Sequence, residues 1–411
     1  MASLATACGQ KLADDPGMTS IFADRISDVP KSFIREILKV AVDPGVISFA
    51  GGLPNRELFP VEEIKQAAIR VLEECGGDAL QYSRTEGHQE LRQYISQRYR
   101  EKHHLDIPVE NILITNGSQQ GLDLMGKVLL NKKDNIVIEE PGYLGAIQAF
   151  SVYRATFQPV PVSEAGMDIG RLQAIMSTRS PKLIYSVPNF SNPSGISYSE
   201  ANRRAVAEVV RNSQTLLIED DPYGDLRFAG TEKPSFKSLM PENTVLLGSF
   251  SKTVVPSFRL GWIVAPDHIM EKLIIAKQAA DLHTNHFGQH VIYRYIKDND
   301  FEQHIRKIVA VYSSQRNAMI KSIRQYFPPG IRHTNPEGGM FLWVTLPEQM
   351  SSMQLFERAI KDKVAFVPGH PFYINRKEVN TLRLNYSCVD AETIKIGIKR
   401  LAQAINEQLA A

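Results

Sequence analysis

Five short apolar runs recur through the middle of the chain, and each one ends in a loop that is rich in polar residues. The runs are Asn111–Ile114, Asn135–Ile138, Pro181–Pro188, Thr215–Ile218 and Thr244–Leu247. Short apolar runs bounded by turn residues predict buried strands. In open α/β sheets, ligands bind at the carboxyl ends of the strands. We therefore expect the polar residues that follow these runs to form a site.

The loop after Thr244–Leu247 combines hydroxyl groups with two cations. Ser249 and Ser251 offer hydroxyl donors, and Arg259 offers a planar guanidinium that suits phosphate oxygens. Lys252 lies between them and is the amine that can form an imine with an aldehyde. A second cation and apolar neighbours lower the pKa of such an amine and make it a better nucleophile. The alternative is a strand end whose lysine and arginine are solvated.

A helix is expected to begin shortly after Asn111–Ile114. The turn at Gly117 leads into apolar residues that recur at helical spacing as far as Leu129. The backbone amides of Gly117, Ser118 and Gln119 are free at this helix N-terminus, where the helix dipole also favours an anion such as phosphate. The alternative is a helix that asparagine or serine caps without any ligand.

An acidic turn follows the run Thr215–Ile218. Asp220 lies at the end of this strand, and Tyr223 follows three residues later. A buried carboxylate at this place can keep a pyridine nitrogen protonated, and the ring then withdraws electrons from a carbanion. Ordinary turn chemistry is the alternative for Asp220, and it is our interpretation of Glu219 and Asp221.

Asn192 and Tyr143 follow two of the other runs. Asn192 precedes a proline that favours an extended backbone, and its amide can bond to a phenolic oxygen or to a carboxylate. Tyr143 carries a ring that can stack on a flat cofactor. The alternatives are a plain surface turn for Asn192, because Asn-Pro is a common turn dipeptide, and an ordinary half-buried ring for Tyr143.

In this order, the residues resemble the pattern of a fold-type-I pyridoxal-phosphate enzyme of the aspartate aminotransferase superfamily, over nearly the whole chain. Three further segments resemble the 2-aminoadipate, kynurenine and valine–pyruvate group of aminotransferases: Ile47–Pro54, Leu80–Gly87 and Leu382–Ser387. The interval from Lys252 to Arg259 is one residue shorter than in aspartate aminotransferases proper, which fits this group. The resemblance implies an α/β fold, with a large domain built on a mostly parallel seven-stranded sheet flanked by helices and a smaller α/β domain.

The resemblance also implies roles around a bound pyridoxal 5′-phosphate. Lys252 forms the imine with the cofactor and moves the proton between Cα and C4′, while Asp220 pairs with the pyridine nitrogen. Tyr223 and Asn192 bond to the 3′ oxygen, and Tyr143 stacks on the ring. The contacts expected at the phosphate end come from Gly117, Ser118, Gln119, Ser249, Ser251 and Arg259, together with Tyr82 of the neighbouring subunit.

For the substrate, the resemblance places Arg383 at the α-carboxylate, with Asn192 assisting it and Gly52 nearby. Arg35 lies in the expected mobile helix Ser32–Val40, where enzymes of this group can set an arginine against a distal carboxylate. The alternatives are a salt bridge at a strand edge for Arg383 and a solvated helix face for Arg35. The working form is expected to be a homodimer with shared active sites.

The composition limits the other possibilities. The chain has 411 residues, of which 43% are hydrophobic, and a formal net charge of +2, so nothing indicates a nucleic-acid partner. Cys8, Cys75 and Cys388 are far apart and lack paired metal spacing, which favours a reducing compartment and no metal. No run of about 20 apolar residues predicts a membrane helix, and Met1–Lys11 lacks the features of a secretory signal. We therefore expect a cytoplasmic protein.

We expect four segments along the chain. They are a flexible N-terminal tail at 1–20, an N-terminal segment at 21–52 that packs with the small domain, a large cofactor-binding domain at 53–284 and a small domain at 285–411. The small domain is expected to begin with a long connecting helix and to include strands at Gly338–Val344 and Thr381–Leu384.

The function that the resemblance implies is transfer of an amino group from an L-amino acid to a 2-oxo acid, such as 2-oxoglutarate or pyruvate, by ping-pong turnover. Decarboxylases and β-lyases on the same fold use the same lysine and aspartate, so the fold alone does not separate them. A third class is the transcription regulators with an aminotransferase-like domain. These need a winged-helix segment ahead of the fold, whereas the aminotransferase pattern begins here by about residue 21.

Overall fold

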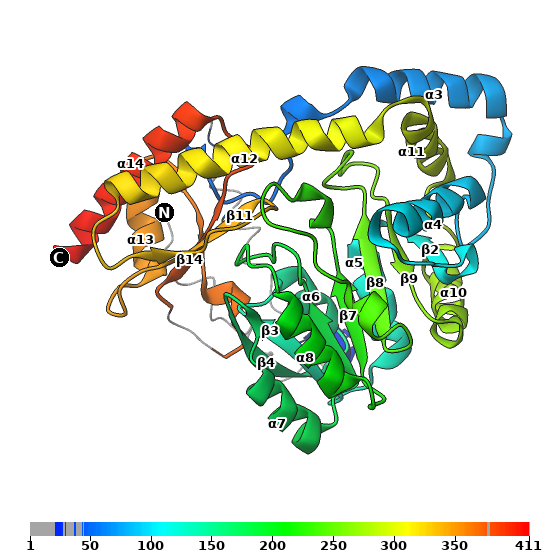
Figure 1. Cartoon of the computed structure of the whole chain (residues 1–411), viewed down its shortest axis with the longest axis horizontal. Helices are drawn as coiled ribbons and strands as arrows, with labels where there is room; N and C mark the ends of the chain where they lie inside the picture. Colours follow the sequence, from blue (N-terminus) through cyan, green and yellow to red (C-terminus); the bar gives the residue numbers. More distant parts are fainter. Residues whose placement is uncertain are drawn as a thin grey trace.

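A computed structural model describes residues 21–27, 29, 37, 43, 45–375 and 379–410 of the chain. The chain forms two main sheets, each covered by helices. In Figure 1 the larger sheet lies to the right and the smaller one to the left. The long helix α12 (Phe301–Tyr326) runs along the top of this view and reaches from the larger part to the smaller part.

The larger sheet has eight strands in the order β2-β9-β8-β7-β6-β3-β4-β5. They are β2 (Ile112–Thr115), β3 (Asn135–Glu140), β4 (Thr156–Ser163), β5 (Gly166–Met167), β6 (Leu183–Ser186), β7 (Leu216–Asp220), β8 (Thr244–Ser249) and β9 (Gly261–Val264). Strands β8, β7, β6, β3 and β4 are parallel, and β9 is antiparallel to both of its neighbours. The expected mostly parallel α/β sheet is confirmed. The eighth strand, β5, has two residues and is too short to give a periodic pattern in the sequence.

Helices cover both faces of this sheet. They are α3 (Val61–Cys75), α4 (Gln89–His103), α5 (Gly117–Leu129), α6 (Leu144–Ser151), α7 (Ile169–Arg179), α8 (Glu200–Val210), α9 (Phe236–Leu239), α10 (Asp267–Asp281) and α11 (His286–Asp298). Alternate strand residues face opposite sides: Leu247 packs in a core cluster with Leu122 of α5, whereas Leu246 packs in a cluster with Ile95 of α4. Strands β2, β6 and β8 are therefore buried along their whole length.

The smaller sheet is antiparallel and has the order β10-β11-β14-β13. Its strands are β10 (Arg332–His333), β11 (Phe341–Thr345), β13 (Val367–Pro368) and β14 (Thr381–Asn385), and the helices near it are α12, α13 (Ser352–Lys361) and α14 (Ala391–Leu409). The N-terminal segment joins this part of the molecule, because β1 (Ile47–Ser48) pairs in parallel with β12 (Val364–Ala365). The short helix α1 (Asp24–Ser27) lies ahead of it in the chain.

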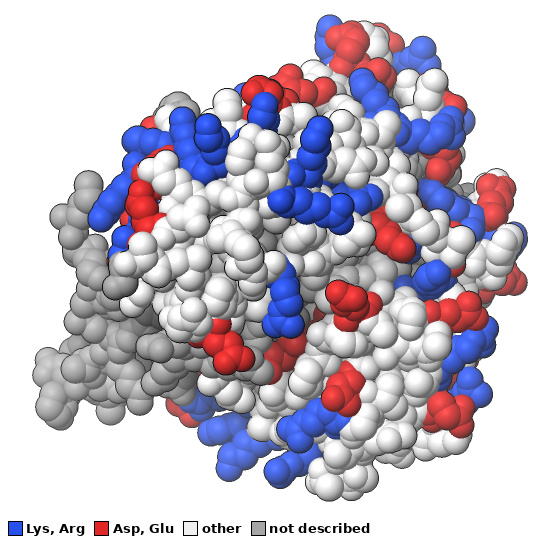
Figure 2. All heavy atoms as spheres, turned by 60° about the vertical axis from the view of Figure 1, so that its left-hand side comes forward, with Lys and Arg blue, Asp and Glu red and all other residues white. Residues whose placement is uncertain are grey.

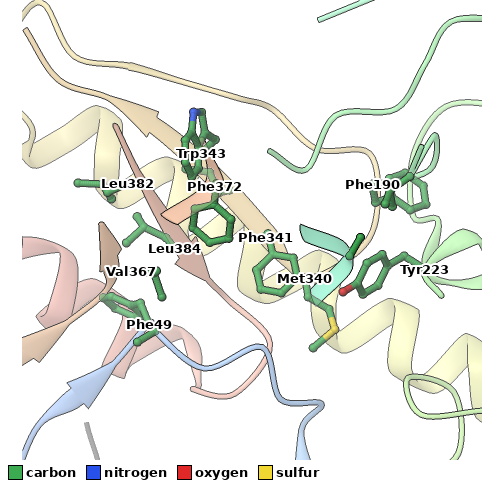
Figure 3. Packing of buried hydrophobic residues seen from close by; sticks show 14 of the residues in the cluster. Phe49, Phe190, Tyr223, Met340, Phe341, Trp343, Val367, Phe372, Leu382 and Leu384 are labelled. Carbon is green, nitrogen blue, oxygen red and sulfur yellow. The ribbon is translucent and has the colours of Figure 1, made fainter. Parts of the chain in front are cut away.

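Aromatic rings pack where the two sheets approach each other. Figure 3 shows Phe341 of β11 with Phe372 on one side and Tyr223 on the other. The rings of Phe341 and Tyr223 meet edge to face, with their centroids 6.0 Å apart. This contact links the smaller sheet to the loop that follows β7, where the candidate site begins.

Charges of both signs are spread over the face of the molecule that Figure 2 shows. The balance agrees with the formal net charge of +2. None of the helices in the described part of the chain combines the length and the apolar character that crossing a membrane requires.

Candidate active site

Lys252 lies in the loop between β8 and β9, close to the N-terminal segment. Its Nζ donates a hydrogen bond to the carbonyl oxygen of Gly52 at 2.9 Å. Burial lowers the pKa of Lys252 to about 8, and the charges of Arg383 and Arg259 act in the same direction, whereas Cys388 acts against them. The sequence predicted that apolar surroundings and a second cation would lower the pKa of this lysine, and the structure agrees. An amine that releases its proton near neutral pH can attack a carbonyl carbon.

Asp220 ends strand β7 and is 2% exposed. Its Oδ2 accepts a hydrogen bond from the hydroxyl of Tyr185 at 2.7 Å, whereas its Oδ1 has no hydrogen-bond partner among the described residues. Burial raises the pKa of Asp220 to about 7. A buried carboxylate oxygen without a partner is costly, and a cationic N–H donor would satisfy it. The side chain therefore points to a ligand rather than to a turn.

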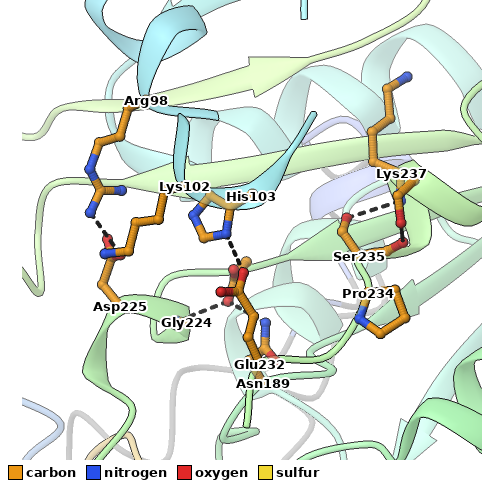
Figure 4. Close-up of polar contacts among 12 residues, drawn as sticks. Arg98, Lys102, His103, Asn189, Gly224, Asp225, Glu232, Pro234, Ser235 and Lys237 are labelled. Carbon is orange, nitrogen blue, oxygen red and sulfur yellow. Dashed lines mark hydrogen bonds and ion pairs between the residues drawn. The ribbon is translucent and has the colours of Figure 1, made fainter. Parts of the chain in front are cut away.

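The two acidic neighbours of Asp220 make turn and cap contacts, as their sequence suggested. Glu219 accepts hydrogen bonds from the hydroxyl of Ser235 and from the backbone amide of Lys237, at the start of α9. Asp221 accepts one from the backbone amide of Gly224 at 2.9 Å. Figure 4 shows Gly224, Ser235 and Lys237, which are the partners of these two carboxylates.

The start of α5 lies beside the loop that carries Arg259. Gly117 has a φ of +72°, and a Cβ atom placed on it would lie 2.6 Å from Nη2 of Arg259. Glycine at this position therefore lets the guanidinium approach the helix end. Asn116 occupies the N-cap position, yet its side chain makes no capping hydrogen bond. The alternative of a helix capped by the side chain of Asn116 is therefore not observed. The first backbone amides of α5 are available to an anion.

The other residues expected around a phosphate lie on this loop and helix. Ser249 and Ser251 are buried, and the Oγ of Ser249 accepts a hydrogen bond from the amide of Ser251 at 3.1 Å. Gln119 is exposed, and its Nε2 donates to the carbonyl oxygen of Gly145 at 3.0 Å. We call the following set the anion cradle: Gly117, Ser118, Gln119, Ser249, Ser251 and Arg259.

Arg383 is a buried cation on β14, with 3% of its surface exposed. Its Nη1 donates to Oδ1 of Asn192 at 2.7 Å, and its Nη2 donates to the carbonyl oxygen of Ala50 at 2.8 Å. In the part of the chain that the structure describes, Nε has no hydrogen-bond partner, and no carboxylate acts on this guanidinium. The alternative of a salt bridge at a strand edge is thus not observed. A buried cation without a counter-charge is suited to an anionic ligand.

Phe341 and Phe372 flank the guanidinium of Arg383, whose carbon lies 4.4 Å and 5.3 Å from the two ring centroids. Burial lowers the pKa of Arg383 to about 10. The rings fix the plane of the guanidinium and exclude water from it. Sequence patterns gave no indication of these two phenylalanines, because each is apolar and reads as part of the core.

Tyr143 and Tyr223 lie near the same charges. Burial raises the pKa of Tyr143 to about 12, and the charges of Asp220, Arg383 and Arg259 also act on it. Burial likewise raises the pKa of Tyr223, and a hydrogen bond with Asn192 opposes the shift. Tyr143 stacks on Tyr185, with centroids 6.4 Å apart and an angle of 26° between the ring planes. The tyrosines, Asp220 and Arg383 therefore surround one site.

Two predicted residues do not join this cluster within the described chain. The side chain of Tyr82 is exposed, at 79%, and its ring packs edge to face against His283. Arg35 lies outside the described residues, as does the expected helix Ser32–Val40 apart from the buried Ile37.

Tyr185 is the functional candidate that the sequence did not single out. It lies on β6, one strand away from Asp220, and faces the core cluster that also contains Leu183 and Leu247. The alternation along the run Pro181–Pro188 places Tyr185 on the side of Leu183. The hydroxyl on an otherwise apolar face was the available signal.

The residues present fit pyridoxal 5′-phosphate on three observations. Lys252 offers an amine with a lowered pKa for an aldehyde, the unpartnered Oδ1 of Asp220 suits a pyridinium N–H, and the uncapped start of α5 beside Arg259 suits a phosphate. The unpartnered Nε of Arg383 suits a carboxylate of the substrate.

The chain matches a known protein family over most of its length. The family model for aminotransferase class I and II matches residues 45–401. The chain belongs to this family. The match includes every predicted site residue except Arg35, and it spans both sheets.

Individual aminotransferases are similar over nearly the full length. The aromatic-amino-acid aminotransferase 1 of Thermococcus litoralis is 40% identical over 394 residues, which cover 94% of each chain. The 2-aminoadipate transaminase of Thermus thermophilus is 40% identical over 386 residues, covering 93% of this chain and 96% of the relative. The solved structure of the Pyrococcus horikoshii kynurenine aminotransferase, in complex with PMP, is 40% identical with a TM-score of 0.91 and covers 95% of this chain and 98% of its own.

Proposed function

We propose that this aminotransferase moves an amino group between an L-amino acid and a 2-oxo acid by ping-pong turnover at the site around Lys252. Pyridoxal 5′-phosphate is the cofactor. When bound, it supplies the carbonyl that takes up the amino group and an electron sink for the carbanion at Cα. The observation that carries the proposal is the buried Oδ1 of Asp220, which has no partner among the described residues, in a chain that also holds a buried amine, Lys252, whose pKa is lowered to about 8.

Three groups of residues would hold the cofactor. The anion cradle binds the phosphate, with the open amides of α5 and the guanidinium of Arg259 as donors. Asp220 holds the proton on the pyridine nitrogen, and Tyr185 orients the carboxylate through its hydrogen bond to Oδ2. Tyr223 and Asn192 bond to the 3′ oxygen, and Tyr143 lies against the ring.

Lys252 carries the proton in this proposal. Because burial holds its pKa to about 8, a useful fraction of the amine is neutral near neutral pH. The neutral Nζ would take the proton from Cα of the amino acid and deliver it to C4′ of the cofactor, and it would reverse this transfer in the second half-reaction. Its hydrogen bond to the carbonyl oxygen of Gly52 keeps Nζ on the side of the N-terminal segment.

Arg383 would bind the α-carboxylate of the substrate. The planar guanidinium can donate hydrogen bonds to two carboxylate oxygens, and Phe341 and Phe372, which lie against it, hold it in one plane. Asn192, already bonded to Nη1, contributes a second contact to the same carboxylate. The α-carboxylate is common to all amino acids, so this contact selects the substrate class and not the side chain.

The side-chain specificity belongs to other residues. Relatives at 40% identity carry names for aromatic amino acids and for 2-aminoadipate, and we propose that this chain accepts donors of both kinds, with 2-oxoglutarate or pyruvate as acceptor. Arg35 would bind the distal carboxylate of acidic donors. A charge-assisted hydrogen bond of this kind is worth about 1.5–3 kcal/mol, so Arg35→Ala should lower kcat/KM for acidic donors roughly tenfold to a hundredfold and spare apolar donors.

The working form that we propose is a cytoplasmic homodimer in which Tyr82 reaches the phosphate of the partner's cofactor. The high exposure of Tyr82 supports a role outside its own chain. The free state of Cys75 and Cys388 suits a reducing compartment. The proposed domain division is 53–284 for the large domain and 285–411 for the small domain, with the segment 21–52 packing with the small domain, although α11 at the start of the small domain packs on the larger sheet.

The experiment that tests the function is a half-reaction without an acceptor. The purified enzyme is mixed with one amino donor at a time, and the cofactor spectrum is followed. A transaminase converts its cofactor to the amine form in stoichiometric amount, and addition of 2-oxoglutarate or pyruvate restores the original spectrum. Release of carbon dioxide or of a side-chain fragment, with the cofactor spectrum unchanged at the end, would instead identify a decarboxylase or a lyase.

A further inference from the structure

The asparagine that precedes α5 bonds to another helix and does not cap its own. Asparagine at the N-cap position ordinarily accepts a hydrogen bond from the second or third amide of the helix. Asn116 occupies this position, but its Nδ2 donates to Oδ2 of Asp281, near the C-terminal end of α10, and its side chain makes no capping bond. The contact with Asp281 therefore accounts for the open amides at the start of α5.

A buried cation fixes Asp281 in place. Lys277 has a side chain that is 0% exposed, and its Nζ donates to both carboxylate oxygens of Asp281 at 2.7 and 2.8 Å. Nζ also donates to Oε1 of Gln120 at 2.8 Å and to Oγ1 of Thr284 at 2.9 Å. The three N–H donors of the ammonium group are thus used by three side chains. Asp281 is held in one position, and its charge is compensated.

Gln120 and Thr284 connect this pair to the elements around it. Gln120 donates through Nε2 to Asp281 at 2.7 Å, and its Oε1 accepts from the backbone amide of Asn116 at 2.8 Å. Thr284 donates to the carbonyl oxygen of Ile114 on β2 at 3.2 Å. The polar network therefore spans β2, α5 and α10, and it lies directly beside the first turn of α5.

We infer that the Lys277–Asp281 ion pair keeps the anion cradle open by holding the side chain of Asn116 away from the helix amides that bind the cofactor phosphate. The inference rests on the proposed function, in which the cradle holds that phosphate. Without Asp281, the side-chain oxygen of Asn116 competes with the phosphate for the same amides. Lys277 neutralises Asp281, whose carboxylate would otherwise repel a phosphate nearby. Both are positioning residues that touch neither cofactor nor substrate.

The test compares two forms of the cofactor that differ by the phosphate. The double variant Lys277→Met/Asp281→Leu replaces the ion pair by apolar side chains, so that no unpaired charge is buried. The full-length protein is freed of cofactor and titrated with pyridoxal 5′-phosphate and with pyridoxal, each followed by absorbance. We expect the variant to bind pyridoxal 5′-phosphate roughly threefold to thirtyfold more weakly, the range that an N-cap hydrogen bond spans, and to bind pyridoxal as the wild type does.

A third substitution distinguishes competition by the Asn116 side chain from a general loss of structure. Adding Asn116→Ala to the double variant removes the competing side chain and should restore most of the lost affinity. Asn116→Ala alone is the matched control and should bind both compounds as the wild type does. Asn116→Ser keeps the ion pair intact but supplies a short side chain that reaches the helix amides, so it should weaken binding of the phosphorylated form even if the double variant does not fold.

Four outcomes would overturn the inference: wild-type affinity in the double variant, equal losses for both compounds, no rescue by Asn116→Ala, or wild-type affinity in Asn116→Ser. A failure of the proposed function looks different. In that case the wild-type protein itself would form no imine with pyridoxal 5′-phosphate, and the variants would show no difference in affinity from it.

Discussion

Tyr185 donates its hydroxyl hydrogen to one oxygen of Asp220 at 2.7 Å and leaves the other oxygen of that carboxylate without a partner among the described residues. The bond lowers the pKa of Asp220, but burial outweighs it and brings the pKa to about 7. The carboxylate is thus oriented from one side and open on the other. This arrangement suits a group that must hold a proton on a ligand nitrogen.

Tyr185→Phe should weaken catalysis without removing the cofactor. Loss of the hydrogen bond raises the pKa of Asp220 further, so the acid limb of the pH profile of kcat/KM should move to higher pH. A hydrogen bond to a charged group is worth about 1.5–3 kcal/mol, and we expect kcat/KM to fall roughly tenfold or more. Tyr198→Phe is the matched control, because Tyr198 donates to the buried Glu139 at 2.8 Å and not to Asp220. If both variants lose the same activity, the role of Tyr185 is structural.

Asp220 should make the cofactor-free protein less stable at alkaline pH. Its folded pKa of about 7 lies above the ordinary value of 3.8, so the protonated form favours folding. The stability is full below about pH 4 and falls as pH rises through 7. Asp220→Asn should therefore stabilise the cofactor-free protein at pH 8, by up to roughly 4 kcal/mol, and leave it unchanged at pH 4. Urea unfolding at the two pH values measures this.

Asp225 provides a control of opposite sign. Burial acts to raise the pKa of Asp225, but Arg98 and Lys102, which both bond to it, lower the pKa overall. Figure 4 shows the two cations meeting this carboxylate. Its charged form favours folding, so Asp225→Asn should destabilise the protein at pH 8. Destabilisation by both substitutions at this pH would contradict the assignment for Asp220.

Arg383→Lys should impair substrate binding and spare the cofactor. Lysine keeps the charge but loses the planar fork that two oxygens require. We expect KM for amino donors to rise roughly tenfold to a hundredfold, while the affinity for pyridoxal 5′-phosphate stays close to that of the wild type. Arg227→Lys is the control, since Arg227 also lies over a phenylalanine ring, at 4.7 Å from Phe190, but pairs with Glu337. An unchanged KM in Arg383→Lys would place the carboxylate elsewhere.

Tyr82 should act on the partner's site in a dimer. Mixing Lys252→Ala chains with Tyr82→Phe chains gives hybrid dimers in which one site carries both lesions and the other carries neither. The hybrid should then have about half the activity of the wild-type dimer, because one of its two sites is intact. Activity no greater than that of the Tyr82→Phe homodimer would mean that each site is built within one chain.

The sequence predicted the parts of the site that lie where strands end. Lys252, Asp220 and Asn192 each follow an apolar run, and parallel strands bring their carboxyl ends to the same edge of the sheet. The strand positions could be predicted because a short apolar run between polar turns is typical of a buried strand. The pKa of Lys252 is lowered as predicted, mainly by burial and to a smaller extent by the charges of Arg383 and Arg259.

The remaining features depend on contacts between residues far apart in the chain. Tyr185 reaches Asp220 because β6 and β7 are neighbours, and Phe341 reaches Arg383 because β11 pairs with β14. The sequence around Asn116 allows an ordinary helix cap, but in the structure Asp281, 165 residues later, holds the side chain of Asn116. Periodicity and turn chemistry describe local structure only, so they carry no information about such pairs.

The attachment point of the cofactor tests the central claim most directly. The holoenzyme is reduced with borohydride, digested, and searched by mass spectrometry for the peptide that carries the reduced cofactor. We predict a single labelled residue, Lys252, and no label and no visible imine absorbance in Lys252→Ala. Label on another lysine would contradict the account, and Lys277 is the buried alternative, although its Nζ is held by Asp281, Gln120 and Thr284.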